Sequence, residues 1–511
     1  MSSKVNGFAG QEPIGNCRRF AFAAIVAGTL LVSQLPARSQ ATAGGTQSNA
    51  QVNKLQRPIS PPDLLIVELK NGADRQKFDD LLQEVHGTYV RTINCGPRLQ
   101  FLVIQAEPGK ANEVQKKLSE NKDIAVVERN HTYRINDTVT AQGHGADVIR
   151  DHLAHHHNNN LFNLPHHHDF FQFPPGHGNT GNPGHGHFGN PGHGHGPGNP
   201  GHGHNPGNPG NPGSPPTGAP NDPDFTAEYP WPFMHVTEAR DSGDAPTGNV
   251  AKLIMCDTGY QPNADSPVAL QQFDFSDPQN PSGAQETPHD SGSHGTEVAT
   301  VTAWTDNALG FAGVMNLEGQ RCSLTVCRIS QDGQSSDSLR IITALSFIAS
   351  TPSLEGLVIN LSFGAAPPNS VNADPAVQQV AQQIQQLGGK LILASGNDGM
   401  VDNSPEQFAR RVAACDQNGN IANFSDTGPF KGCAPGVNVP VYTSTHGTAP
   451  FLGSGTSFAA PNYAAGVAVV QAATGMSAAQ ADALILQTGT QVSGGFVVPN
   501  FKAALDQATG H

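Results

Sequence analysis

Three short stretches carry the residue types of an activated hydroxyl nucleophile. The run VAKLIMCD ends in Asp257, SHGTEVATVTAW contains His294, and GSGTSFAAP contains Ser457. A hydroxyl, a base and a carboxylate that orients the base are the parts needed for nucleophilic attack on an acyl group. Singly, each has a plainer explanation, because Asp and Ser often cap helices and a lone His is usually a hydrogen-bonded surface group. The hypothesis therefore depends on whether the fold brings the three together.

The elements around these residues are predicted to end or begin at one edge of a parallel sheet. The near-continuous apolar run before Asp257 predicts a buried parallel strand, whose carboxyl end is where open α/β sheets build their sites. A helix is predicted over Phe458 to Ala473, and Pro461 fits only its first turn, which holds Ser457 close to the helix N-terminus. From about Asn221 onward, apolar strands alternate with helical patterns, as in a parallel α/β sheet.

Composition limits the partners and indicates a linker. The chain of 511 residues contains 57 Gly and 40 Pro, too many for a uniformly packed protein. Its formal net charge is −14, without a dense Lys/Arg cluster, which argues against nucleic acid or an anionic membrane as the main partner. A protein or small-molecule substrate is favoured.

The N-terminus has the pattern of an export signal. Arg18 and Arg19 precede the apolar run Phe20 to Val32, and small residues follow at Ala41 to Ala43. We therefore expect a signal peptide over residues 1–43 and a secreted protein, extracellular or periplasmic. A buried or uncleaved anchor helix is the alternative, although the run is short for a bilayer. The paired arginines alone are a weak twin-arginine signal, and no membrane association is expected after signal removal.

Two further regions precede the α/β part. Residues 63–136 alternate the β-rich runs LLIVEL, QFLVIQA and IAVVE with helical patterns at Asp74 to Val85 and Lys110 to Glu120, which predicts a small α+β domain. In residues 138–222, HGH, GNPG and PGHG recur, and 15 of the 22 His fall between His144 and His204. Such a segment buries too little surface to offset its ordering entropy, so a disordered linker is expected.

The His-rich linker has two interpretations. Clusters such as His155 to His157 and His166 to His168 could bind transition metals at neutral pH. Alternatively, the tract is a solvated spacer whose only role is reach.

The ordered motifs resemble those of the subtilisin-like serine proteases, the subtilases. DTG at 257–259, HGT at 294–296 and GTSFAAP at 455–461 follow the Asp, His, Ser order of that family. The resemblance covers residues 221–511, with the catalytic domain assigned to 223–511. It implies a three-layer α/β fold with a mostly parallel central sheet, and a serine endopeptidase that hydrolyses protein substrates through an acyl-enzyme.

The same resemblance implies further site residues. LILASGNDG at 391–399 resembles the family segment that supplies an oxyanion-hole amide, here Asn397. INLSFG and DGQSS resemble the two edges that pair with an extended peptide substrate by β-augmentation. The predicted substrate-binding residues are Ser362, Phe363, Gly364, Gly333, Gln334 and Ser335.

Metal and cofactor expectations also follow from the resemblance. AWTDNALGFAGV resembles a helix interrupted by a calcium loop, which makes Asn307 a plausible ligand of a structural calcium ion and Asp265 a weaker one. No cofactor is required for the chemistry. The chain departs from the family pattern at Glu297, Cys256 and Phe458, which leaves the pocket shape and the pH response open.

The segment DIAVVERNHTYRIN at 123–136 resembles the end of the subtilase inhibitory propeptide. The resemblance implies that the small domain assists folding in cis, that its tail occupies the active site, and that self-cleavage occurs near Asn136. A monomer is expected. An odd number of Cys lies in the protease part, and Cys415 with Cys433 is the first candidate for a disulfide.

Two other classes of function remain as alternatives. The chain could be a non-catalytic secreted binding protein on a subtilase scaffold, or a metal-binding protein whose main element is the His-rich tract. The presence of all three motif residues together with Asn397 counts against the first, and the second leaves the α/β part unexplained.

Overall fold

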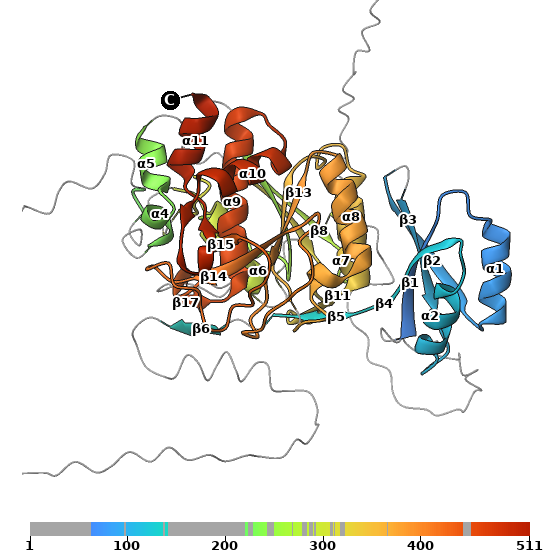
Figure 1. The fold of residues 1–511 in the computed structure, drawn as a ribbon. Coiled ribbons are helices and arrows are strands. Elements are labelled where there is room, and N and C mark those ends of the chain that lie inside the picture. The colour runs from blue at the N-terminus through green and yellow to red at the C-terminus, as the bar shows by residue number, and fades with distance from the viewer. Residues whose placement is uncertain are drawn as a thin grey trace, which may run out of the picture. The chain divides into compact units, whose positions relative to one another are not determined.

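The computed structural model describes residues 63–96, 99–135, 138–141, 220–222, 228–242, 250–267, 269–277, 284–285, 290, 293–306, 310, 312–316, 322–364, 366–442 and 451–510 (Figure 1). The predicted signal peptide and nearly all of the predicted linker lie outside the described residues.

A small α+β domain begins at residue 63. Its elements are β1 (Leu64–Leu69), α1 (Arg75–Glu84), β2 (Thr88–Cys95), β3 (Leu99–Gln105), α2 (Ala111–Ser119) and β4 (Ile124–Arg129). The antiparallel sheet has the order β2-β3-β1-β4. The predicted runs and helices are present, and α1 starts after Asp74, whose side chain accepts hydrogen bonds from the first-turn amides. The sequence reasoning missed β2, because TYVRTINC mixes polar residues with only two buried positions.

The main domain is built on a ten-stranded sheet of order β18-β19-β15-β14-β13-β12-β7-β10-β8-β9. Its strands are β7 (Ala251–Asp257), β8 (Ala269–Asp274), β9 (Ala284–Gln285), β10 (Cys322–Arg328), β12 (Val358–Leu361), β13 (Lys390–Ala394), β14 (Arg410–Cys415), β15 (Gly432–Pro435), β18 (Thr490–Gln491) and β19 (Val497–Val498). The pairings from β8 through β19 are parallel, and the strand at each end, β9 and β18, pairs antiparallel.

Helices cover both faces of this sheet. The described helices of the domain are α4 (Pro230–Phe233), α5 (Val236–Asp241), α6 (His294–Ala303), α7 (Ser338–Ala349), α8 (Pro375–Gln386), α9 (Thr456–Thr474), α10 (Ala478–Thr488) and α11 (Phe501–Thr509), with short 3₁₀ turns η3 (Val371–Ala373) and η4 (Ser493–Gly495). Leu253 and Met255 of β7 share a buried cluster with α6 and α9, whereas Ile254 and Cys256 share one with α7 and α8. Burial on both faces explains the unbroken apolar run. The predicted three-layer fold, with α9 to α11 on one side and α7 and α8 on the other (Figure 1), is confirmed.

Two small sheets join segments that are far apart in the sequence. In one, β5 (Thr132–Arg134) pairs with β11 (Ser335–Asp337). In the other, β6 (Thr138–Ala141) and β16 (Val439–Val441) lie on either side of β17 (Phe451–Ser454). In both, residues that follow the small domain pair with strands of the main domain.

The central helix α9 begins earlier than predicted. It starts at Thr456, so Pro461 lies inside the helix rather than in its first turn. A proline cannot donate a hydrogen bond to the carbonyl four residues earlier, which here belongs to Ser457. The Ser362 hydroxyl donates to this carbonyl instead, at 3.1 Å. The replacement donor explains why the helix tolerates the proline.

The predicted disulfide between Cys415 and Cys433 is wrong for this structure, in which both are free, buried thiols on neighbouring strands. The strand register places Cys433 opposite Ala413 and Cys415 opposite Pro435. That offset of two residues, about 6.6 Å along the strands, adds to a strand spacing of about 4.8 Å. The resulting distance is longer than the roughly 4.4–6.8 Å between Cα atoms that a disulfide usually spans.

Candidate active site

Asp257 and His294 form a buried pair at the carboxyl end of β7. The Nδ1 atom of His294 lies 2.7 Å from Oδ1 of Asp257, and the side chains are 5% and 0% exposed. The Thr258 amide donates to the same carboxylate oxygen at 2.7 Å. Burial raises the pKa of Asp257, while His294 and the Thr258 amide act in the opposite direction. A carboxylate held in this way can fix the tautomer of an imidazole and stabilise its protonated form.

A second carboxylate fixes the start of the His294 helix. Oδ2 of Asp290 accepts a hydrogen bond from the Thr296 amide at 2.8 Å, and its Oδ1 accepts one from the Thr258 hydroxyl at 2.7 Å. That hydroxyl also accepts from the Gly295 amide at 2.9 Å. Asp290 and Thr258 thus tie the end of β7 to the N-terminus of α6. The sequence reasoning missed Asp290, whose only signal was an acidic residue just before the His motif.

Ser457 lies in the first turn of α9, which packs against both α6 and β7. Ser457 is buried, with 3% of its surface exposed, and its hydroxyl donates to the Ser362 carbonyl at 3.2 Å. The rings of Phe363 and Phe458 lie 6.5 Å and 6.2 Å from that of His294. The three predicted nucleophile-forming residues therefore occupy adjoining elements: a strand end, and the N-termini of two packed helices.

Asn397 follows β13 and is anchored to the first residue of α9. Its Oδ1 accepts hydrogen bonds from both the amide and the hydroxyl of Thr456, each at 2.8 Å. The amide is therefore held by its oxygen, which leaves its nitrogen as the donor end. The Ser457 amide lies in the first turn of α9, at the helix terminus that favours negative charge.

The loop that carries Asn397 rests on Asp426. The Asp426 carboxylate is fully buried and accepts hydrogen bonds from the amides of Asp398 at 3.2 Å and Met400 at 2.7 Å. Gly396 has a φ of 116°, and a Cβ there would collide with this carboxylate. Burial raises the pKa of Asp426. Nothing in the sequence pattern pointed to Asp426, because its partners are backbone amides of a distant loop.

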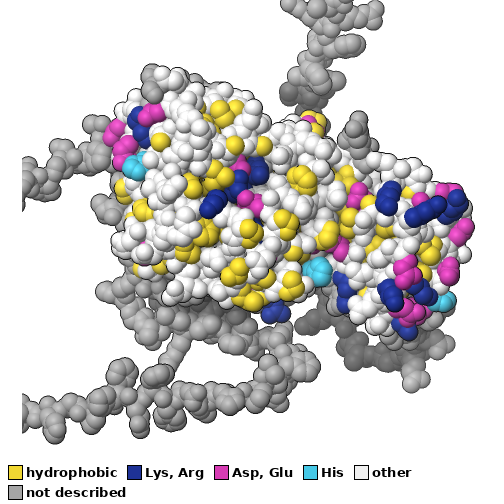
Figure 2. All heavy atoms as spheres, in the orientation of Figure 1, with side chains coloured by type: hydrophobic (Ala, Val, Ile, Leu, Met, Phe, Trp, Pro, Cys, Tyr) yellow, Lys and Arg dark blue, Asp and Glu magenta, His cyan; other side chains and the backbone are white. Residues whose placement is uncertain are grey.

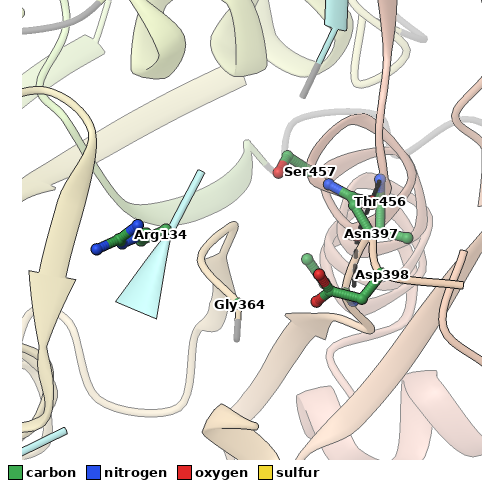
Figure 3. A pocket seen from close by; sticks show the side chains of 8 residues that line it. Arg134, Gly364, Asn397, Asp398, Thr456 and Ser457 are labelled. Carbon is green, nitrogen blue, oxygen red and sulfur yellow. Dashed lines mark hydrogen bonds between the residues drawn. The ribbon is translucent and has the colours of Figure 1, made fainter. Parts of the chain in front are cut away.

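A pocket joins these elements. It is lined by Arg134, Gly364, Ala394, Gly396, Asn397, Asp398, Thr456 and Ser457. Figure 3 shows Ser457, Thr456 and Asn397 together on one side, and Arg134 on the other with its guanidinium directed away from Ser457.

The segment after the small domain runs as an extended strand between two edges of the main domain. On one side β5 pairs with β11, and the Ile135 amide donates to the Gln334 carbonyl at 3.0 Å. On the other, Arg134 and Gly364 exchange two backbone hydrogen bonds, of 2.8 Å and 3.1 Å. Among the predicted substrate-binding residues, Gln334 and Gly364 hold this strand by backbone hydrogen bonds, and Ser335 lies opposite Arg134 in the register of β11.

The remaining residues of that prediction have other surroundings. Gly333 adopts a left-handed turn with φ of 72°, and its amide donates to Ser330. Ser362 bonds the backbone of Ser457, and Phe363 lies beside His294. These three residues shape the site around the strand: Gly333 through its turn, Ser362 through Ser457, and Phe363 beside His294.

The extended segment is held again beyond the pocket. In the antiparallel pair of β6 and β17, Thr138 lies opposite Ser454, three residues before Ser457. Only residues 136 and 137 separate the two held segments, and Asn136, near which cleavage is predicted, lies outside the described residues.

The structure describes only one of the two residues predicted to bind calcium. Asp265 is buried, and its backbone carbonyl accepts a hydrogen bond from the Thr305 amide at 2.8 Å, while Asn307 lies outside the described residues. Within the described ranges, no group of three or more His, Cys, Asp or Glu is placed to hold a metal ion. The calcium site therefore stays a prediction.

The three departures from the family pattern are all buried. Glu297 and Phe458 lie within α6 and α9, and Cys256 lies opposite Cys327 in the register of β7 and β10. None replaces a residue of the predicted nucleophile.

Comparison with known proteins agrees with this arrangement. The family model Peptidase_S8, described as the subtilase family, matches residues 217–510. Thermitase of Thermoactinomyces vulgaris is 30% identical over 283 residues, which cover 54% of this chain and 93% of thermitase. Subtilisin Savinase of Lederbergia lenta is 29% identical over 253 residues, covering 47% of this chain and 84% of that protein.

Among solved structures, the epidermin leader peptide processing serine protease of Staphylococcus aureus aligns with a TM-score of 0.54 at 15% identity, over 88% of this chain and 99% of that one. At this identity the likeness shows the fold alone. The family match and the thermitase relationship show the class: a subtilisin-like serine endopeptidase acting on protein substrates. The chain belongs to the subtilase family.

Proposed function

We propose that this chain is a secreted endopeptidase, made as a preproprotein, that cleaves peptide bonds with Asp257, His294 and Ser457. The buried hydrogen bond of 2.7 Å between His294 and Asp257, beside the helix that presents Ser457, is the observation that carries the proposal.

The steps of the reaction follow from the chemistry of the three side chains. His294 takes the proton of the Ser457 hydroxyl as its oxygen attacks the scissile carbonyl, and Asp257 stabilises the imidazolium that forms. His294 then gives the proton to the departing amine, which leaves an acyl ester on Ser457. A water molecule, deprotonated by His294, attacks the ester and releases the acid product and the free hydroxyl.

The charge that develops on the carbonyl oxygen needs donors already in place. We assign these to the Asn397 side-chain amide, anchored through its oxygen to Thr456, and to the backbone amide of Ser457. The chemistry uses side chains and backbone only, without a cofactor.

Maturation is part of the proposal. Residues 63–136 would act in cis as an inhibitory propeptide, since the segment Thr132–Ile135 is held in the cleft by the backbone pairs that a substrate would use. Cleavage near Asn136 would separate this domain from the protease, which we expect to act as a monomer.

Export is the other part of the proposal. Residues 1–43 would be removed as a signal peptide, leaving the protein in the extracellular or periplasmic space. Within the described part of the chain, no helix has the length and apolar character needed to cross a membrane.

A fluorophosphonate probe tests the nucleophile directly. We expect the matured protein to be labelled at Ser457, and Ser457→Ala to abolish labelling. Ser477→Ala, which removes a serine from another helix N-terminus, is the matched control and should label normally. A folded matured protein that resists the probe would favour a non-catalytic binding protein.

A further inference from the structure

Tyr133 is fully buried in the middle of the strand that occupies the cleft. Its backbone lies opposite Ser336 of β11, and its side chain is 0% exposed. The phenol hydroxyl donates to Oδ2 of Asp374 at 2.6 Å and lies 3.3 Å from the Ser338 hydroxyl. A distance of 2.6 Å is typical of a hydrogen bond to an ionised oxygen. Polar groups of the main domain therefore recognise the phenol hydroxyl by hydrogen bonding.

Asp374 and Ser338, which contact this hydroxyl, are held in place by hydrogen bonds that do not involve the tyrosine. Oδ2 of Asp374 also accepts from the Ser338 hydroxyl at 2.6 Å, and its Oδ1 accepts from the Val377 amide at 3.0 Å as the N-cap of α8. Asp374 is 3% exposed and Ser338 is 0% exposed. Because these bonds lie within the main domain, the acceptor keeps its position when the strand leaves, which lowers the cost of binding a new hydroxyl.

The surroundings of the phenol ring are apolar. Tyr133 belongs to a buried cluster that contains Leu339, Phe363 and Val371 of the main domain. An aromatic ring is thus accepted by apolar packing, while its para position meets a carboxylate. A phenylalanine would fill the same space but leave the carboxylate without this donor, so the two side chains differ here by one hydrogen bond to a charged group.

A carboxyl group of the small domain also approaches this helix terminus. Oε1 of Glu128 accepts from the Ala376 amide at 3.0 Å, and burial together with the negative charge of Asp374 raises the pKa of Glu128. A peptide substrate brings no such group. Asp374 then lacks this neighbouring carboxyl and keeps its hydrogen bonds to the Ser338 hydroxyl and the Val377 amide.

We propose that Asp374 and Ser338 are specificity-determining residues that select substrates with a tyrosine three residues before the one whose carbonyl Ser457 attacks. The inference rests on the proposed function and places the cleavage near Asn136 directly after that residue, three residues after Tyr133. A substrate strand that pairs with the same edges, β11 and Gly364, has the register of β5 and directs the corresponding side chain into the same pocket.

Two peptides that differ by one oxygen test the selection. The matured enzyme is given Tyr-Arg-Ile-Asn and Phe-Arg-Ile-Asn, each blocked at its N-terminus and joined to a chromogenic amine. We expect kcat/KM to be about 10- to 100-fold higher for the tyrosine peptide, the range that a hydrogen bond to a charged group represents.

Asp374→Asn is the decisive variant, because asparagine retains the helix cap but loses the charge. We expect the ratio of the two kcat/KM values to fall to about a few-fold, because the hydrogen bond to the tyrosine hydroxyl no longer ends on a charged oxygen. Ser477→Ala removes the cap of α10 and serves as the matched control, whose ratio should equal that of the wild type. Normal fluorophosphonate labelling of each variant verifies that the site is folded.

The outcomes separate this inference from the proposed function. Equal kcat/KM for the two peptides in the wild type overturns the tyrosine pocket while leaving the protease intact. A ratio that survives Asp374→Asn assigns the preference to other residues and overturns the role of Asp374. An enzyme that cleaves neither peptide nor any protein counts against the proposed function, and with it against the inference.

Discussion

The two sheets of this chain are covered in different ways. The large sheet is buried on both faces by helices of its own domain, α6 and α9 on one side and α7 and α8 on the other. The small sheet has its own helices on one face only, where Leu65 and Val67 pack with α1 and α2. On its other face, Ile66, Phe101 and Val103 belong to the same cluster as residues of α7 and α8.

Polar contacts follow the same division. The Gly96 amide donates to the Ser350 hydroxyl at 2.9 Å, so the end of β2 is fastened to the end of α7. At the start of α7, Oδ1 of Asn130 accepts a hydrogen bond from the Leu339 amide at 2.9 Å. At the start of α8, Glu128 accepts one from the Ala376 amide. Figure 2 shows the charged side chains of the view gathered largely over α1 and α2. The small domain therefore has a solvated helical face and a sheet face that depends on the main domain.

This difference predicts that the small domain stays bound while its second sheet face is covered by the main domain. Once released, the small domain should lose stability. A main domain complete without it can persist as the active enzyme.

The largest expected effect is a loss of peptidase activity, which should also leave the small domain covalently joined to the main domain. Ser457→Ala, His294→Ala and Asp257→Asn should each lower peptidase activity by on the order of 10⁴-fold or more, because the three groups act as a unit. The full chain of Ser457→Ala should accumulate uncut when expressed in a host lacking other proteases, as mass spectrometry would show. A mature N-terminus near residue 137 in that variant would mean that the cut does not depend on Ser457 of the same chain.

The next effect concerns the oxyanion donors, which belong to the main domain alone. Asn397→Ala should lower kcat by about 10²- to 10³-fold with little change in KM, since the lost hydrogen bond forms chiefly in the transition state. Thermal unfolding of the main domain is the control and should remain nearly unchanged. A proportional rise in KM instead would show that Asn397 binds substrate in the ground state.

Adjacent residues of β1 test the two faces of the small sheet directly. Leu65→Ala removes packing against its own helices, and Ile66→Ala removes packing against the main domain; both side chains are 0% exposed. Each truncation should cost about 2–5 kcal/mol where its face is buried. Leu65→Ala should destabilise the released small domain, measured by urea unfolding, whereas Ile66→Ala should mainly weaken its complex with the protease.

Equal destabilisation of the released domain by both substitutions would contradict this division. It would mean that the face of Ile66 stays buried after release.

A smaller, pH-dependent effect is expected from Glu128. Its pKa is raised in the complex by burial and by Asp374, so the bound form retains a proton that the free form gives up above its ordinary pKa of about 4.3. The contribution to binding is fully present below that pKa and is lost as pH rises toward the raised value. The dissociation constant should increase by at most tenfold per pH unit. Glu128→Gln should flatten this dependence, and an unchanged slope in that variant would assign the titration elsewhere.

The predictable part of the molecule is the part coded locally. The strand before Asp257, the glycine-flanked Asn397 and the helix at Ser457 each stand in short stretches whose residue types fix both structure and position. Asp290, Asp426 and Asp374 could not be found in this way. Their partners are backbone amides or hydroxyls distant in the sequence, and only the folded register brings them together.

The pairing of the two regions was likewise expected only through the family resemblance. The apolar positions of β1 on both faces are visible in LLIVEL, but the sequence does not say which helices cover the second face. The start of α9 was misplaced for a related reason, because the donor that compensates for Pro461 is Ser362, almost a hundred residues away.

The smallest effect should come from the His-rich tract that joins the compared regions, residues 138–222, most of which lie outside the described residues. A spacer needs only length, and about 85 residues of Gly-rich coil have an r.m.s. span of roughly 50 Å. We therefore expect replacement of its His by Ser to leave the rate of maturation unchanged, measured by the appearance of the released small domain.

Zinc titrated into an isolated 138–222 peptide by calorimetry tests the other interpretation. Imidazoles with an ordinary pKa of about 6.5 are neutral ligands at pH 7.5 and become protonated in mild acid. Heat of binding at neutral pH that disappears in mild acid would identify a metal-binding tract. Slower maturation of the Ser-substituted chain would contradict a role as spacer alone.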